Sequence, residues 1–283
     1  MTKRRIAWML LAFLMTAMSW AQTEKTVTLL HTNDMHSRIE PFPDTYADTL
    51  YAGKGGMVRR ATCVRDEREK DPDLLLLDAG DFSQGTPYYN MFKGEVEISL
   101  MNHMRYDAAT IGNHEFDFGL ENMARLFRMA KFPIVCANYD VTGTVLEGCV
   151  KEYVVLERKG LRIGIFGLGA ELDGLVLSDL YEGIRFENPI QEAQRVATLL
   201  REQEKCDVVV CLSHLGWKGQ GWSDVELVKS TRHIDVVVGG HSHSLFERPV
   251  TYPNLDGREI PVQQMGKNGA FVGKMEIHVS KVN

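Results

Sequence analysis

The sequence predicts an α/β protein. Residues 74–77 and 208–212 are short and apolar throughout, as strands buried on both faces of a sheet are. Stretches with helical periodicity, such as residues 57–70 and 188–200, alternate with these runs. Several runs end in short polar segments that contain Asp, Asn or His, and open α/β folds place their functional groups at such strand ends.

The first 21 residues are expected to be a signal peptide and not part of the fold. A basic segment at 3–5 precedes an apolar run at 6–18, and Ser-Trp-Ala at 19–21 places small residues where signal peptidase reads, so we expect cleavage after Ala21. The alternative is an uncleaved N-terminal anchor. We therefore expect a periplasmic or secreted protein whose residues 22–283 form a single domain.

Composition and charge narrow the possible partners. The chain has 283 residues, of which 44% are hydrophobic and 25% charged, as in ordinary globular domains. Loss of the three cations in the leader takes the formal net charge from −6 to −9, which disfavours binding to nucleic-acid polymers or anionic membranes. No other stretch is long and apolar enough to span a membrane. The five cysteines show no CxxC spacing and are expected to be small buried side chains, not a disulfide framework.

In the first third of the chain, two predicted strands end at candidate metal ligands. The strand at 27–33 leads into Asp34-Met35-His36, and residues i and i+2 of an extended or loop segment project to the same side, so Asp34 and His36 can reach one ion. A loop at 37–56 and a helix at 57–70 follow, with Val58, Ala61 and Val64 at helical spacing. The next strand, 73–78, ends near Asp81. Taken alone, each of these segments is also consistent with a polar turn.

The segment 111–119, Ile-Gly-Asn-His-Glu-Phe-Asp-Phe-Gly, is the most informative in the chain. It follows a predicted helix at 95–104 and a strand at 106–111. Gly112 permits a tight turn where a side chain would clash. If the turn runs into a helix, His114 and Asp117 share a face, so that Asp117 can orient the imidazole. The alternative is a polar loop in which Asn113 caps a helix.

The remainder of the chain is expected to continue the alternation of strands and helices. The predicted elements are a helix at 120–130, a strand at 133–137, hairpin strands at 153–157 and 161–167, a helix from 188 to 200, a strand at 207–213, a helix at 223–230, a strand at 235–238, and closing strands at 261–264 and 270–279. Asn188 as N-cap and Pro189 at the first helical position predict the start of the helix at 188–200. His214 follows one of these strands and is by itself more typical of a structural residue. His241 and His243 follow another strand after a glycine pair, a spacing that indicates metal binding.

Taken together, the polar side chains at five strand ends predict one composite metal site. The candidate ligands are Asp34, His36, Asp81, Asn113, His214, His241 and His243. Seven ligands suit two divalent ions that share a bridging Asp, and oxygen and nitrogen ligation without thiolate suits Zn, Mn, Fe or Co. Two such ions with two carboxylates leave a net charge of about +2, which matches a phosphate dianion. An ion pair of this kind activates a shared water, which predicts hydrolysis without a protein nucleophile.

The combined pattern DxH, GD, GNHE, H and GHxH resembles the calcineurin-like metallophosphoesterase superfamily. The longer segments around these motifs are similar to those of the catalytic domain of secreted 5′-nucleotidases, over roughly residues 26–280. These segments are LHTNDMH, DAGDFSQGT, GNHEFDFG, LSHLG and GGHSH. The resemblance implies a four-layer α/β/β/α sandwich of two mixed sheets with the site at one sheet edge.

The resemblance also implies roles for the site residues. One ion would be held by Asp34, His36, Asp81 and His243, and the other by Asp81, Asn113, His214 and His241. His114, oriented by Asp117, would contact the phosphate and the leaving oxygen while a metal-bound hydroxide attacks phosphorus in line. The expected reaction is hydrolysis of phosphate monoesters, foremost of 5′-nucleotides to nucleosides and phosphate.

The chain departs from the family pattern in one respect. Two-domain members carry a C-terminal domain whose aromatic side chains stack on the nucleobase, and this sequence ends at Asn283, where that domain would begin. One hypothesis is that a separate polypeptide supplies the domain; otherwise the chain would be a broad phosphomonoesterase. Alternative substrates for the same site are 2′,3′-cyclic phosphodiesters, sugar nucleotides and thiosulfate esters. A non-catalytic binding module is disfavoured because it would be expected to have lost ligands, and none is missing.

Overall fold

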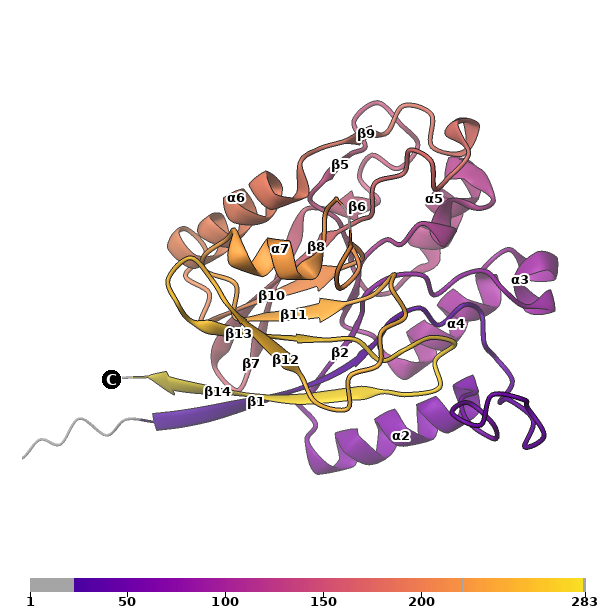
Figure 1. Ribbon diagram of the computed structural model, residues 1–283, viewed down its shortest axis with the longest axis horizontal. Coiled ribbons are helices and arrows are strands. Elements are labelled where there is room, and N and C mark those ends of the chain that lie inside the picture. The colour runs from indigo at the N-terminus through magenta and orange to yellow at the C-terminus, as the bar shows by residue number, and fades with distance from the viewer. Residues whose placement is uncertain (1–22, 220, 282–283) are drawn as a thin grey trace, which may run out of the picture.

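The computed structural model describes residues 23–219 and 221–281, so the predicted signal peptide at 1–21 lies outside the described residues. Two six-stranded mixed sheets form the centre of the molecule (Figure 1). The first sheet has the strand order β14 (Gly273–Lys281), β1 (Thr23–Thr32), β2 (Leu75–Asp78), β3 (Ala108–Ala109), β4 (Ile134–Val135) and β6 (Val150–Lys151). The second has the order β12 (Val250–Pro253), β13 (Glu259–Gln263), β11 (Val236–Gly239), β10 (Val208–Ser213), β8 (Leu161–Leu168) and β7 (Tyr153–Arg158).

Helices cover the outer faces of both sheets. On the first sheet lie α2 (Met57–Lys70), α4 (Glu95–Met104) and α5 (Gly119–Met129), with the short α3 (Pro87–Phe92) beside α4. On the second sheet lie α6 (Pro189–Glu202) and α7 (Asp224–Lys229). The remaining elements are two 3₁₀ turns, η1 (His114–Phe116) and η2 (Ser178–Leu180), and a small pair of strands, β5 (Tyr139–Asp140) and β9 (Arg185–Phe186).

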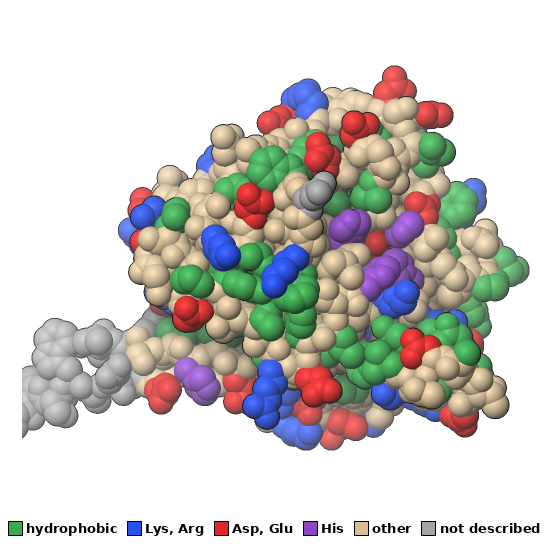
Figure 2. Space-filling view, in the orientation of Figure 1, with side chains coloured by type: hydrophobic (Ala, Val, Ile, Leu, Met, Phe, Trp, Pro, Cys, Tyr) green, Lys and Arg blue, Asp and Glu red, His purple; other side chains and the backbone are tan. Residues whose placement is uncertain are grey.

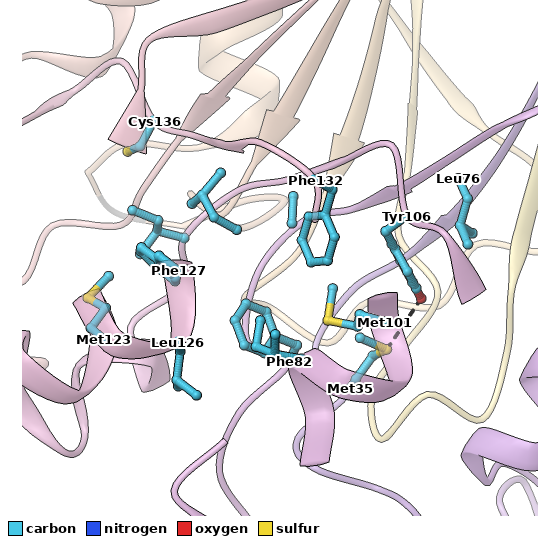
Figure 3. Close-up of a cluster of buried hydrophobic side chains, with 14 of the residues drawn as sticks. Met35, Leu76, Phe82, Met101, Tyr106, Met123, Leu126, Phe127, Phe132 and Cys136 are labelled. Carbon is cyan, nitrogen blue, oxygen red and sulfur yellow. Dashed lines mark hydrogen bonds between the residues drawn. The ribbon is translucent and has the colours of Figure 1, made fainter. Parts of the chain in front are cut away.

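Alternation of side chains along the buried strands produces the four layers. Leu75 and Leu77 of β2 pack between the two sheets with strand residues of the second sheet, whereas Leu76 points to the helical layer. In that outer layer Leu76 belongs to the same cluster as Phe82, Met101 and Tyr106 (Figure 3). Because successive strand residues face opposite sides and both faces are covered, central strands such as β2 and β11 are almost wholly apolar. The predicted α/β/β/α sandwich is therefore confirmed.

Most predicted elements are present, and the differences have physical causes. Asn188 caps α6 as predicted, with its side chain accepting hydrogen bonds from the backbone N–H groups of Ile190 and Gln191. Val58 shares the helical spacing of Ala61 and Val64, yet it is 79% exposed, because α2 instead buries Met57, Arg60 and Val64. The short elements α3, β5, β6, β9 and β12 were not predicted, since two to six residues carry little periodicity.

The cysteines are all free, as expected, and three of them are buried, although Cys63 is exposed and Cys149 only partly covered. Within the described ranges no helix combines the length and apolar character that crossing a bilayer requires.

Candidate metal centre

The loops that follow five parallel strands meet at one edge of the two sheets. β1, β2 and β3 are neighbours in the first sheet, and β10 and β11 are neighbours in the second. Backbone hydrogen bonds join the first two loops, from the Asp34 N–H to the Gly80 carbonyl and from the His36 N–H to the Asp81 carbonyl, both 2.9 Å. Histidine side chains gather at one place on the face shown in Figure 2, with an acidic side chain among them. The predicted convergence of strand ends is therefore observed.

The first group of donors comprises Asp34, His36 and His243, whose ligand atoms lie within 4.8 Å of one another. The Nε2 atoms of His36 and His243 are 3.0 Å apart, and Asp34 Oδ1 lies 3.3 Å from His243 Nε2. Two imidazole nitrogens and a carboxylate oxygen thus face a common point. Asp34 is fully buried, and a buried carboxylate requires cationic or hydrogen-bonding partners.

The second group comprises Asp81, His214 and His241, whose ligand atoms also lie within 4.8 Å of one another. His214 donates from Nδ1 to the Ala79 carbonyl at 2.7 Å, which places the lone pair on Nε2. That Nε2 is buried without a hydrogen-bond partner and lies 3.2 Å from Asp81 Oδ2. A nitrogen lone pair facing a carboxylate oxygen suits a shared cation, and a carbonyl behind the imidazole is the usual second partner of a metal-bound histidine.

Asn113 supplies a further oxygen donor. Its side chain is 5% exposed, and Oδ1 is buried without a hydrogen-bond partner among the described residues. The N–H of the next residue, His114, donates to Asp81 Oδ1 at 2.9 Å, so Asn113 adjoins the second group. Asn113 makes no side-chain capping bond to the 3₁₀ turn that follows, so the capping alternative is wrong.

The structure also brings His114 to the edge of this centre. His114, His36 and Asp81 form a third group within 4.8 Å, so Asp81 belongs to two groups, as a bridging carboxylate would. Asp117 accepts a hydrogen bond from His114 Nδ1 at 3.1 Å across the turn η1, as the spacing predicts. Although burial opposes the shift, the hydrogen bond to Asp117 and the nearby Asp81 charge raise the pKa of His114.

Charge interactions inside the centre are strong because it is buried. Burial lowers the pKa of His214, but the adjacent Asp81 carboxylate outweighs it and raises that pKa to about 10. A metal ion that binds Nε2 would displace the proton there, so the tautomer with its lone pair on Nε2 is the metal-binding form. Burial favours protonated Asp81, yet the charges of His214, His36 and His114 hold the pKa of Asp81 below its usual range. Burial and the His214 charge lower the pKa of His241 to about 4, which leaves a neutral imidazole. The Asp81 carboxylate therefore stays ionised and attracts cations.

The backbone at the candidate ligands is strained. Asp34, His36, Asp81, His241 and His243 all have positive φ, between 46° and 70°. Non-glycine residues rarely adopt this left-handed region, and such outliers cluster at functional sites. Of the two conformations expected to project Asp34 and His36 to the same side, extended or loop, the structure has the loop, in which both residues are left-handed.

Glycines leave the space that this packing needs. A Cβ on Gly112 would lie 2.1 Å from Asp81 Oδ1, so the predicted clash is confirmed and its partner is the Asp81 carboxylate. A Cβ on Gly80 would lie 2.8 Å from His214 Nδ1, and one on Gly240 would lie 2.9 Å from the same atom. Substitution at any of these positions therefore displaces a candidate ligand.

Two residues that support the site were missed from sequence. Glu115 is 1% exposed and accepts hydrogen bonds from the backbone N–H groups of Asp81, Ser83 and Gly112, so it ties the loop after β2 to the turn after β3. Asn33 donates to Asp34 Oδ2 at 2.6 Å and to the Gly266 carbonyl at 2.9 Å. Both residues lie beside candidate ligands in the sequence, and that position was the signal of a supporting role. It does not show which backbone groups each side chain reaches.

Comparison with known proteins agrees with the site. The family model for calcineurin-like phosphoesterases matches residues 27–245. Snake venom 5′-nucleotidase of Crotalus adamanteus is 34% identical over 279 residues, covering 92% of this chain and 46% of that protein. A 5′-nucleotidase precursor from Thermus thermophilus superposes with a TM-score of 0.81 at 33% identity, covering 89% of this chain and 51% of that one. The NAD nucleotidase of Haemophilus influenzae gives a TM-score of 0.78 at 26% identity, covering 92% and 55%.

The fold and the clustered donors are those of the metal-dependent phosphoesterases. The chain belongs to the calcineurin-like phosphoesterase family, and the predicted resemblance to 5′-nucleotidases within it is confirmed. It spans about half the length of the curated relatives it matches.

Proposed function

We propose that this domain hydrolyses phosphate monoesters, foremost 5′-nucleotides to nucleosides and phosphate, with the aid of two divalent metal ions. One observation carries the proposal: two groups of buried donors lie side by side, and unpartnered acceptor atoms, His214 Nε2 and Asn113 Oδ1, occur among them. Buried polar atoms normally have a hydrogen-bond partner, so buried acceptor atoms without one indicate a cation-binding site. Names of the relatives supply the substrate class.

The donor set fits the metals expected. Asp34, His36, Asp81 and His243 would hold one ion, and Asp81, Asn113, His214 and His241 the other, with Asp81 shared. When bound, the ions supply Lewis acidity toward the phosphate and lower the pKa of water. Oxygen and nitrogen donors without thiolate are compatible with Zn, Mn, Fe or Co.

His114 is suited to protonate the leaving oxygen. Its raised pKa keeps the imidazole protonated to higher pH, and the hydrogen bond from Nδ1 to Asp117 leaves Nε2 as the nitrogen that can meet the substrate. Proton donation by a positioned histidine contributes typically about 10²–10⁴-fold to the rate. Asp117 thus holds the ring in one orientation and one protonation state.

One alternative has a specific observation behind it. The structural similarity to an NAD nucleotidase favours substrates in which phosphate lies between two nucleosides. In such a dinucleotide the link is a pyrophosphate, and each of its two phosphates carries one negative charge less than a phosphate monoester. Export from the cytoplasm stays a prediction from residues 1–21.

Metal analysis combined with a substrate panel tests the proposal. Purified wild type and Asp81→Asn would be compared for bound metal and for turnover of AMP, 2′,3′-cyclic AMP, NAD and a sugar nucleotide. We expect about two metal ions per chain and preferential AMP turnover in wild type, both lost in the variant. Asp66→Asn, an exposed aspartate on α2, is the matched control. Full AMP turnover in Asp81→Asn would contradict the assignment, and preference for NAD would favour the alternative.

A further inference from the structure

A cavity of about 380 Å³ opens beside the metal centre, between the loop after β2, helix α3 and the turn that follows η1. Its walls include Gln84, Gly85, Asn90, Asp117 and Phe118. Small-molecule sites commonly have volumes of about 300–1,000 Å³. The cavity therefore has room for the organic part of a small phosphate ester.

Two wall residues connect the cavity to the centre. Asp117 holds His114 by the hydrogen bond to Nδ1, and Gly85 packs against His36, since a Cβ there would lie 3.3 Å from the His36 carbonyl oxygen. The cavity thus lies beside residues that contact His36 and His114. In the proposed reaction the leaving oxygen departs beside His114, so the group attached to that oxygen extends toward this cavity.

The aromatic wall suits a flat ring. Phe118 is 38% exposed, and the buried Tyr89 supports it from within, with ring centroids 5.0 Å apart at 52°. Tyr89 is itself fixed by a hydrogen bond from its hydroxyl to the His114 carbonyl at 3.3 Å. An exposed phenyl ring on a rigid support gains little from an aliphatic alcohol but stacks well on a nucleobase.

The polar wall suits hydroxyl groups. In the described part of the chain the side-chain amides of Gln84 and Asn90 form no hydrogen bond to other residues. Each amide offers two donors and one acceptor, which match the hydroxyls of a ribose. By contrast Thr86, in the same wall, is already bonded to the hydroxyl and carbonyl of Ser37.

We propose that this cavity is a nucleoside subsite, in which Phe118 stacks on the base while Gln84 and Asn90 bind the ribose. The inference rests on the proposed function for its orientation, because it takes His114 as the leaving-group side. It assigns base recognition to residues of this domain itself.

Kinetics on two esters that differ only in the base test the subsite. AMP and ribose 5-phosphate would be compared with wild type and Phe118→Ala. Loss of one stacked base should raise KM for AMP by about tenfold and leave KM for ribose 5-phosphate unchanged. Phe118→Trp should restore the AMP value. Phe92→Ala is the matched control, because Phe92 is a 45% exposed phenylalanine of α3 that does not line the cavity.

Calorimetric titration with adenosine separates this inference from the proposed function, because it needs no turnover. Adenosine should bind wild type and the Phe92→Ala control equally and Phe118→Ala about tenfold more weakly. If wild type hydrolyses no phosphate ester but this difference appears, the proposed function fails and the subsite stands. If adenosine binding and the AMP KM are the same in Phe118→Ala as in wild type, the subsite is refuted.

Discussion

Gly112→Ala should disable the metal centre without unfolding the domain. A Cβ at this position would lie 2.1 Å from Asp81 Oδ1, 2.5 Å from the Asp81 backbone nitrogen and 2.7 Å from Asp81 Cγ, whereas ordinary contacts begin at 3.4 Å. The Asp81 carboxylate must therefore move by more than about 1 Å, because densely packed interiors do not absorb such an overlap. The movement also breaks the hydrogen bond from the His114 N–H to Asp81 Oδ1, so both the carboxylate that we propose is shared and the proposed proton donor shift.

The expected magnitude follows from that displacement. A misplacement of about 1 Å at a reacting centre costs on the order of 100-fold in rate. We expect kcat/KM for AMP to fall by at least that factor, which corresponds to about 2.7 kcal/mol of transition-state stabilisation. Bound metal, measured by mass spectrometry after dialysis, should fall in parallel, while circular dichroism stays that of the wild type.

The matched control is Gly219→Ala, where an added Cβ meets nothing within 4 Å and the backbone φ is not left-handed. This variant should retain full metal content and kcat/KM. Gly112→Ala with wild-type metal content and turnover would show that Asp81 does not have to sit where the structure places it, and would refute the reasoning.

Three further predictions concern the residues around the ligands. Asp117→Asn should move the alkaline limb of the kcat/KM–pH profile to lower pH, because the carboxylate raises the pKa of His114 and the protonated form is lost as pH rises through that pKa; an unmoved limb would count against His114 as the acid. Glu115→Ala should lower the free energy of unfolding in urea by about 3 kcal/mol, since three buried N–H groups lose their acceptor, whereas exposed Glu121→Ala should change it by less than about 0.5 kcal/mol. Chelation with EDTA should abolish turnover and lower Tm in calorimetry, with recovery on adding back Zn or Mn, because ligands that bind the folded state stabilise it; an unchanged Tm would argue that no ion is bound there.

Sequence patterns predicted the long elements well and the short ones poorly. The helix expected at 57–70 is α2 (Met57–Lys70), because fourteen residues carry clear periodicity. Asn188-Pro189 marked the start of α6, because capping chemistry is local. Helix α3 has six residues, which are too few to show a helical periodicity in the sequence. The burial of Arg60 in α2 could not be predicted from sequence either, because its hydrogen-bond partner, the Gly269 carbonyl, lies 209 residues away in the chain.

The sequence by itself determined the chemistry of the candidate centre. The side-chain types after five apolar strands indicate metal ligands, and they can be read from sequence because a buried parallel strand delivers its polar end to a predictable edge of the sheet. Tertiary structure alone decided how those ligands are used. The lone pair on His214 Nε2 depends on a carbonyl 135 residues away, and the grouping of His36 with His243 depends on a contact across 207 residues. Contacts of this range depend on how the two sheets pack against each other, and no local pattern records that packing.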